Sequence, residues 1–216
     1  MTSNKILFIC LFFVLTQVNA EEDVFRYPLS PATRDAFNTT CINLADKPVT
    51  RGNFVQEKFL SRFNRSLDSS GNFLIAGERG MIWETLMPFP STMIMGRDFI
   101  MQSRPDGRYS ILGAQGNETF TQMAVVISSV FSGQVQRLME NFHVYFTGSV
   151  SNWSMGLVPR NSIFASFASR ITMSGGSVIR SIRLFESNGD IVTYTLLNHS
   201  FPQGLSVNEE ALFTTP

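Results

Sequence analysis

The sequence is poor in the side chains with which secreted enzymes usually do chemistry, because its 216 residues include only two histidines and two cysteines. Neither His143 nor His199 has a cysteine or carboxylate at ligand spacing, which argues against a zinc or copper site. Acidic pairs occur only at Glu21–Asp23 and Glu209–Glu210, near the chain ends, where side chains are mostly solvated. No nucleophile elbow or phosphate-binding glycine loop is present. These features argue against an enzyme, and we expect no cofactor and no metal.

Charge of one sign is also lacking. Lysine and arginine together number 17, as do aspartate and glutamate, and there is no basic run. This balance argues against nucleic acid or an anionic membrane surface as the main partner.

Long apolar runs are absent except near the start, at Ile6 to Leu15. Lys5 precedes this run and Val18-Asn19-Ala20 follows it, which is typical of a signal peptide cleaved after Ala20. The run is too short to span a bilayer, and no later segment approaches the roughly 20 residues needed. We therefore expect an exported chain without stable membrane insertion, in which residues 21–216 form a single domain. Only Cys41 survives cleavage, so no internal disulfide is expected.

The spacing of apolar residues predicts a mainly β, α+β fold. Ser30-Pro31 is a helix start signal, and Phe37, Cys41 and Leu44 share a face of the helix that Lys47-Pro48 should end. From Thr50 onward, apolar residues recur at every second position, which is typical of strands. Short strands without helices between them predict an antiparallel meander. The predicted strands are 51–60, 72–76, 81–87, 91–95, 99–103, 108–112, 143–150, 153–158, 170–173, 178–186 and 191–198, with a short helix at 162–168.

A helical insertion interrupts the strands at Asn117 to Phe142. Phe120, Met123 and Ile127 fall on one helical face, and a second stripe follows after Gly133. Helices inserted in a meander must bury such a stripe on the sheet or across its open end. On composition alone, ordinary core filling is the simpler explanation for the many methionines, but the inserted helices favour a cavity with a lid.

Several segments together resemble the periplasmic outer-membrane lipoprotein carriers, the LolA-like family, over about Thr50 to Glu210. The segment Gly52 to Glu57 has the Phe-x-Gln of that family's opening strand, and Trp83 to Pro88 has its Trp-x-x-x-x-Pro. Further similar segments are Ser70-Gly71, Trp153 to Pro159, Gly189-Asp190 and Phe201 to Val207.

This resemblance implies an unclosed antiparallel β-barrel, a strongly curved sheet whose apolar concave face is covered by helices. It also implies a periplasmic carrier that takes the acyl chains of a lipoprotein from an inner-membrane ABC-type transporter and passes them to an outer-membrane receptor. A related shuttle or sensor for a fatty acid, phospholipid or glycolipid is the alternative. In such a carrier the segment Gly71 to Met95 needs no catalytic group, because it only has to form part of the apolar wall of the cavity. The expected wall residues are Phe54, Met81, Trp83, Met87, Met93, Met95 and Phe99, with Phe120, Met123 and Ile127 as the inner stripe of the lid.

The family's best-known branch has an arginine, directly followed by proline, that holds the lid after the second strand. Here Arg79 occupies a similar place but lies closer to Trp83 and is followed by Gly80. The resemblance therefore implies a lid role for Arg79, and an exposed loop arginine is the alternative.

Overall fold

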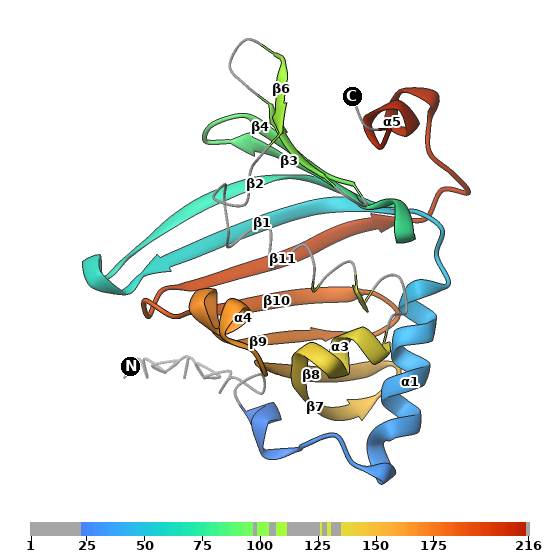
Figure 1. Cartoon of the computed structure of the whole chain (residues 1–216), viewed down its shortest axis with the longest axis vertical. Coiled ribbons are helices and arrows are strands. Elements are labelled where there is room, and N and C mark those ends of the chain that lie inside the picture. Colours follow the sequence, from blue (N-terminus) through green and yellow to red (C-terminus); the bar gives the residue numbers. More distant parts are fainter. Residues whose placement is uncertain are drawn as a thin grey trace, which may run out of the picture.

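The computed structural model describes residues 23–96, 99–103, 107–111, 126, 129–130 and 135–214. Its centre is one antiparallel sheet of eleven strands in the order β6-β5-β4-β3-β2-β1-β11-β10-β9-β8-β7 (Figure 1). The strands are β1 (Thr50–Leu60), β2 (Arg65–Ile75), β3 (Met81–Met87), β4 (Ser91–Met95), β5 (Ile100–Ser103), β6 (Tyr109–Ile111), β7 (Phe142–Ser149), β8 (Asn152–Pro159), β9 (Ala168–Gly175), β10 (Ile179–Glu186) and β11 (Ile191–Ser200). The helices are α1 (Pro31–Ala45), α3 (Val135–Asn141), α4 (Ser162–Phe167) and α5 (Val207–Leu212).

The sheet is not closed, because β6 and β7 are its two edges. Chain neighbours pair within β1–β6 and within β7–β11, and the long-range pairing of β1 with β11 joins the two halves. This confirms the predicted unclosed antiparallel sheet. Within the described residues, no helix has the length and apolar character needed to cross a membrane.

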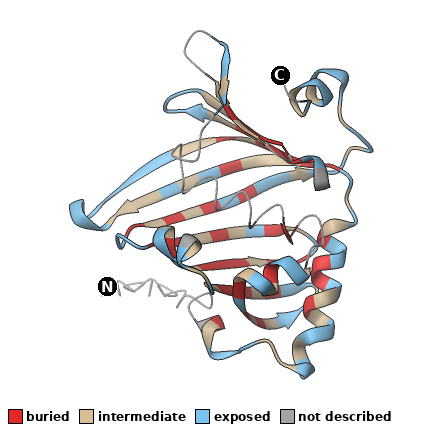
Figure 2. Cartoon of the chain, viewed as in Figure 1, coloured by how far each residue is buried: buried red, intermediate tan, exposed pale blue. Residues whose placement is uncertain are grey.

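Side chains that face each other across neighbouring strands lie on the same face of a sheet. Phe73 is opposite Trp83, and Trp83 is opposite Met93. We call the face that carries these three residues the inner face, and the face that carries Leu74 and Ile82 the outer face. Buried and more exposed residues alternate along the strands as this geometry requires (Figure 2).

At β7, β8 and β9 the inner face is covered by α1, α3 and α4 (Figure 1). Phe37 of α1 is fully buried, and its ring meets that of Phe146 edge-on, with centroids 5.6 Å apart. Phe164 of α4 packs on Phe142, with centroids 4.9 Å apart. Leu138 of α3 is buried in the same cluster. The helix predicted from Ser30-Pro31 is therefore confirmed as α1, with its apolar stripe on the sheet.

The segment before α1 closes the edge of the sheet at β7. A short helix, η1 (Asp23–Arg26), contacts β7 and β8, and Val24 in it is fully buried. The amide of Leu29 donates to the carbonyl of Val144, and the amide of Phe146 donates to the carbonyl of Tyr27, both at 2.9 Å. These bonds satisfy an edge that would otherwise be open to pairing with another chain.

Two elements differ most from the sequence prediction, and β9 is also longer at both ends than the predicted 170–173. The second strand begins at Arg65 rather than 72, because its polar first half pairs with β1 up to the Leu60–Arg65 pair at the hairpin end. The chain end, predicted to be solvated, forms α5 instead, with Ser206 and Glu209 making a capping box. Leu205 and Phe213 on either side of α5 pack on a small outer-face cluster of Val49, Leu74 and Ala76.

Candidate functional site

Four aromatic rings from four strands meet on the inner face. Trp83 of β3 stacks on Phe54 of β1 at a centroid distance of 4.1 Å and an interplanar angle of 25°. Phe73 of β2 stacks on the same indole at 6.1 Å, and Tyr194 of β11 meets it edge-on at 5.4 Å. Their packing spans the junction between the two halves of the sheet, so the inner face is apolar across that junction.

Methionine side chains extend this apolar surface on both sides of the rings. Met81, Met93 and Met95 are buried on β3 and β4, and Met155 and Met173 are fully buried on β8 and β9. All five belong to one cluster with the aromatic residues. Unbranched thioethers adapt to the shape of a neighbour, so such a surface suits a flexible apolar ligand.

The structure brings together five of the seven predicted wall residues: Phe54, Met81, Trp83, Met93 and Met95. Met87, at the end of β3, is 61 % exposed and lies outside the cluster. Phe99 is half-buried just before β5, with its ring against Gly96 rather than in the cluster. Whether these residues line a ligand site stays a prediction.

The predicted lid residues Phe120, Met123 and Ile127 lie outside the described residues. Val126 and Val130, from the same segment, are buried in the inner-face cluster. Arg79 has a partner other than the lid that the resemblance implies. Its guanidinium donates to Glu210 of α5 at 2.8 Å, and more than half of its side chain is exposed.

The second half of the sheet carries buried inner-face side chains that the predicted wall set does not include, among them Phe146, Met155, Met173 and Tyr194. The alternation of apolar residues along β7–β11 is the sequence signal that identifies them, and Met155 lies within the Trp153–Pro159 segment of the resemblance. Trp153 was part of the resemblance, and the structure shows why it is buried there. Its indole N–H donates to the carbonyl of Gly176 at 2.8 Å, which anchors the turn between β9 and β10.

The inner face also carries ionisable groups. The Lys58 ammonium pairs with Glu186 at 2.9 Å. Burial, and then the charge of Glu186, raise the pKa of Tyr194, which keeps its hydroxyl neutral. Burial lowers the pKa of His199, with a smaller lowering from Lys47, against a backbone hydrogen bond with Ile179 that raises it.

These groups do not form a reactive centre. Burial raises the pKa of the Cys41 thiol to about 12, so the thiolate needed for nucleophilic attack is scarce at neutral pH. Across the described ranges, no three histidine, cysteine, aspartate or glutamate side chains are grouped to hold a metal ion. The arrangement of the inner face is thus suited to burying apolar groups.

Comparison with known proteins gives a family match. The family model described as outer membrane lipoprotein carrier protein LolA matches residues 48–209. No match was found among curated proteins. The chain is similar in structure to a LolA superfamily protein from Nitrosomonas europaea, at 9% identity and a TM-score of 0.48, over 82% of this chain and 97% of that one. It is also similar to the structure of the Pseudomonas aeruginosa MucA/MucB complex, at 10% identity and a TM-score of 0.46, over 86% of this chain and 61% of that one. A third similar structure is that of Mycobacterium tuberculosis lipoprotein LppX, at 9% identity and a TM-score of 0.43, over 83% of this chain and 100% of that one.

Proposed function

Because the chain belongs to the LolA family of outer membrane lipoprotein carrier proteins, we propose that it is a periplasmic carrier for the acyl chains of a lipoprotein. Residues 1–20 serve as its export signal, and 21–216 form the carrier domain. The observation that supports this most is the apolar inner face, which runs across both halves of the sheet and is covered by α1, α3 and α4 at β7–β9.

The physical need for such a carrier follows from the solubility of lipids. Each methylene moved from water into an apolar surface gains about 0.8 kcal/mol, so a lipoprotein with several acyl chains would not cross an aqueous space unshielded. The same gain would prevent release if the chains fitted too tightly. Adaptable residues such as Met93 and Met155 allow acyl chains of different lengths to be held without a rigid fit.

In this proposal the cargo comes from an inner-membrane ABC-type transporter and passes to an outer-membrane receptor. Transfer requires that the helices on the inner face move aside, because they cover part of the apolar surface that the acyl chains need. No bond is made or broken, so no catalytic residue is assigned.

The first test is native mass spectrometry of the protein purified from a periplasmic extract, followed by lipid extraction. A bound lipoprotein or lipopeptide would support the lipoprotein carrier. Bound fatty acid, phospholipid or glycolipid would replace it with the alternative, a shuttle or sensor for that lipid. A protein that is empty and also fails to bind an acylated fluorescent probe would refute lipid binding.

A matched pair of substitutions tests the inner face itself. Met93→Gln places an amide of similar size on the buried surface, whereas Met87→Gln makes the same change at an exposed site. Burying an amide without a partner costs about 1–3 kcal/mol, so we expect Met93→Gln to weaken acyl-probe binding about tenfold. Circular dichroism checks that both variants fold. Equal affinities of the two variants would contradict the assignment of the inner face.

A further inference from the structure

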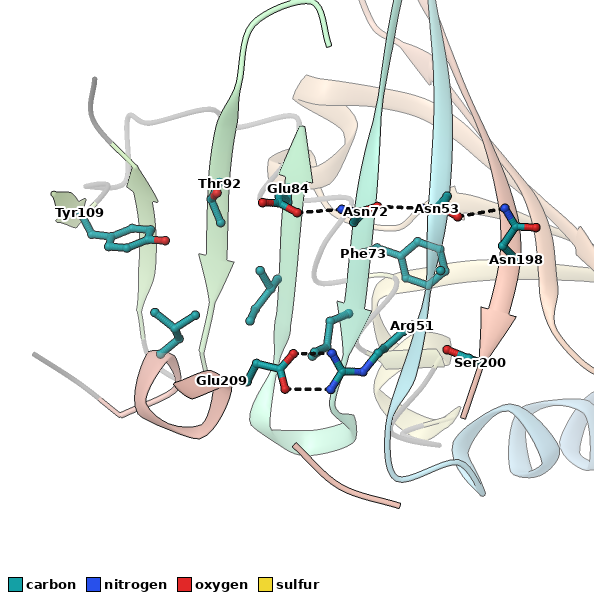
Figure 3. Close-up of a pocket in the computed structure, with 14 residues that line it drawn as sticks. Arg51, Asn53, Asn72, Phe73, Glu84, Thr92, Tyr109, Asn198, Ser200 and Glu209 are labelled. Atoms are coloured by element: carbon teal, nitrogen blue, oxygen red, sulfur yellow. Dashed lines mark hydrogen bonds and ion pairs between the residues drawn. The ribbon is translucent and has the colours of Figure 1, made fainter. Parts of the chain in front are cut away.

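A second candidate site lies on the other side of the sheet, in a groove between the outer face and α5. We call it the outer groove. Its volume is about 530 Å³, and its floor crosses β11, β1, β2, β3 and β4 (Figure 3). It does not share the inner face's apolar character, because amides, hydroxyls and carboxylates line it together with aliphatic groups. It therefore needs an explanation separate from lipid carriage.

A directed row of hydrogen bonds crosses the floor of the groove. The Asn198 amide donates to the Asn53 carbonyl oxygen at 2.9 Å, Asn53 donates to Asn72 at 2.7 Å, and Asn72 donates to a Glu84 carboxylate oxygen at 2.8 Å (Figure 3). Each bond fixes which way the next amide points, and successive bonds polarise one another. The row is thus a preorganised set of donors and acceptors.

The backbone contributes to this arrangement. Asn53, Asn72, Glu84 and Thr92 face each other in register across β1, β2, β3 and β4, so their spacing follows the strand separation of about 4.8 Å. That spacing is comparable to the length of one pyranose ring. Asn198 joins the row from β11, where its positive φ of 52° accompanies the irregular pairing between β11 and β1.

Two ion pairs connect α5, the wall of the groove, to the rest of the protein. Arg51 on the floor forms a bidentate pair with Glu209 of α5, one bond being 2.8 Å long. Arg79 binds the adjacent Glu210. Leu212 of α5 and the ring of Tyr109 add apolar surface to the groove. The groove thus combines polar and apolar walls of fixed position.

The charge of the groove indicates what it would bind. The Arg51 guanidinium is committed to Glu209, and no cation of the described residues pairs with Glu84. The second oxygen of Glu84 can accept a hydrogen bond, as can the side-chain oxygens of Asn198 and Thr92. The negative charge of Glu84 would repel an anion, whereas the hydroxyl groups of a neutral ligand would donate hydrogen bonds to these oxygens.

We propose that the outer groove binds a neutral saccharide, with vicinal hydroxyls on the Glu84–Asn72–Asn53–Asn198 row and a sugar face against the Tyr109 ring. Hydroxyl groups both donate and accept, so they suit a row of carboxamides that does the same. An extended peptide is less suited, since it is usually recognised by main-chain pairing at a strand edge, and this site lies on the face of the sheet. The proposal does not depend on the carrier function.

Saturation-transfer NMR on the whole mature chain tests this with cellotetraose, maltotetraose and tetra-N-acetylchitotetraose at millimolar concentration. We expect saturation of at least one of these sugars and a dissociation constant measurable by calorimetry. Tyr109→Ala should weaken binding at least tenfold and Glu84→Gln at least fivefold. The matched controls are Tyr27→Ala and Glu57→Gln, which change an exposed tyrosine and an exposed glutamate outside the groove.

Three outcomes would overturn the proposal. The first is no saturation transfer to any of the three sugars. The second is binding that Tyr109→Ala and Glu84→Gln leave unchanged. The third is a loss of acyl-probe affinity in these two variants without sugar binding, which would assign the groove to lipid. If the variants keep full acyl-probe affinity and lose the sugar, the outer groove and the inner face are independent sites.

Discussion

The C-terminal helix α5 is joined to the sheet by the Arg51–Glu209 ion pair and by the packing of Leu205 and Phe213, and Glu209→Gln tests the contribution of the ion pair. The Arg51 guanidinium, with help from Ser206 and against the opposing effect of burial, lowers the pKa of Glu209 from 4.5 to about 2. In a pair shielded from water, that lowering would correspond to about 3 kcal/mol. The Arg51 and Glu209 side chains are 34% and 19% exposed, so solvent screening reduces the contribution to about 1 kcal/mol.

We therefore expect Glu209→Gln to increase the opening of α5 about fivefold at neutral pH, seen as faster amide hydrogen exchange in Val207–Leu212. The thermal midpoint of the whole domain should hardly change, because α5 contributes few buried residues. Glu210→Gln is the control, since the Arg79–Glu210 pair is more than half exposed and should matter little. Equal exchange rates in the wild type and Glu209→Gln would refute this reasoning.

The same pair makes the attachment of α5 pH-dependent. The pKa of Glu209 is lower in the folded protein than in the unfolded chain, so its contribution is complete above about pH 4.5. It is lost as the pH falls through about 2. The amide hydrogen exchange of Val207–Leu212 should therefore report more frequent opening of α5 in this acid window, and Glu209→Gln should remove that change.

Three further predictions concern the core. Trp83→Ala should lower the free energy of unfolding by about 3–5 kcal/mol in urea titrations, because three rings contact the indole; a loss below about 1 kcal/mol would contradict the stacked packing. Gly71→Ala should destabilise the fold by about 1–3 kcal/mol, since the new Cβ would lie 1.9 Å from the Glu84 carbonyl oxygen. Its control, Gly204→Ala, has open space and should be neutral or slightly stabilising in the same titration. The Cys41 thiol, with its pKa raised to about 12 by burial, should resist a disulfide reagent at pH 8 until urea is added, and fast labelling of the folded protein would contradict this.

Local sequence patterns predicted several elements closely. The bounds of β3 and β4 agree with the prediction because apolar alternation is strong there and prolines follow β3. The first half of β2 was missed because its residues are polar, and only pairing with β1 makes them a strand. For α5 a signal was present, the Ser206–Glu209 capping box, but its position near the chain end suggested a solvated tail.

The sequence by itself determined which positions alternate between apolar and polar, and hence that this chain builds an antiparallel sheet with one apolar face. Periodicity is local, so it can be read from neighbouring residues. Only the tertiary structure decided that β1 pairs with β11 and that Arg51 meets Glu209, 158 residues away in the chain. The Asn198–Asn53 bond of the outer groove likewise spans 145 residues. Such contacts depend on the register and curvature of the whole sheet, which no local pattern specifies.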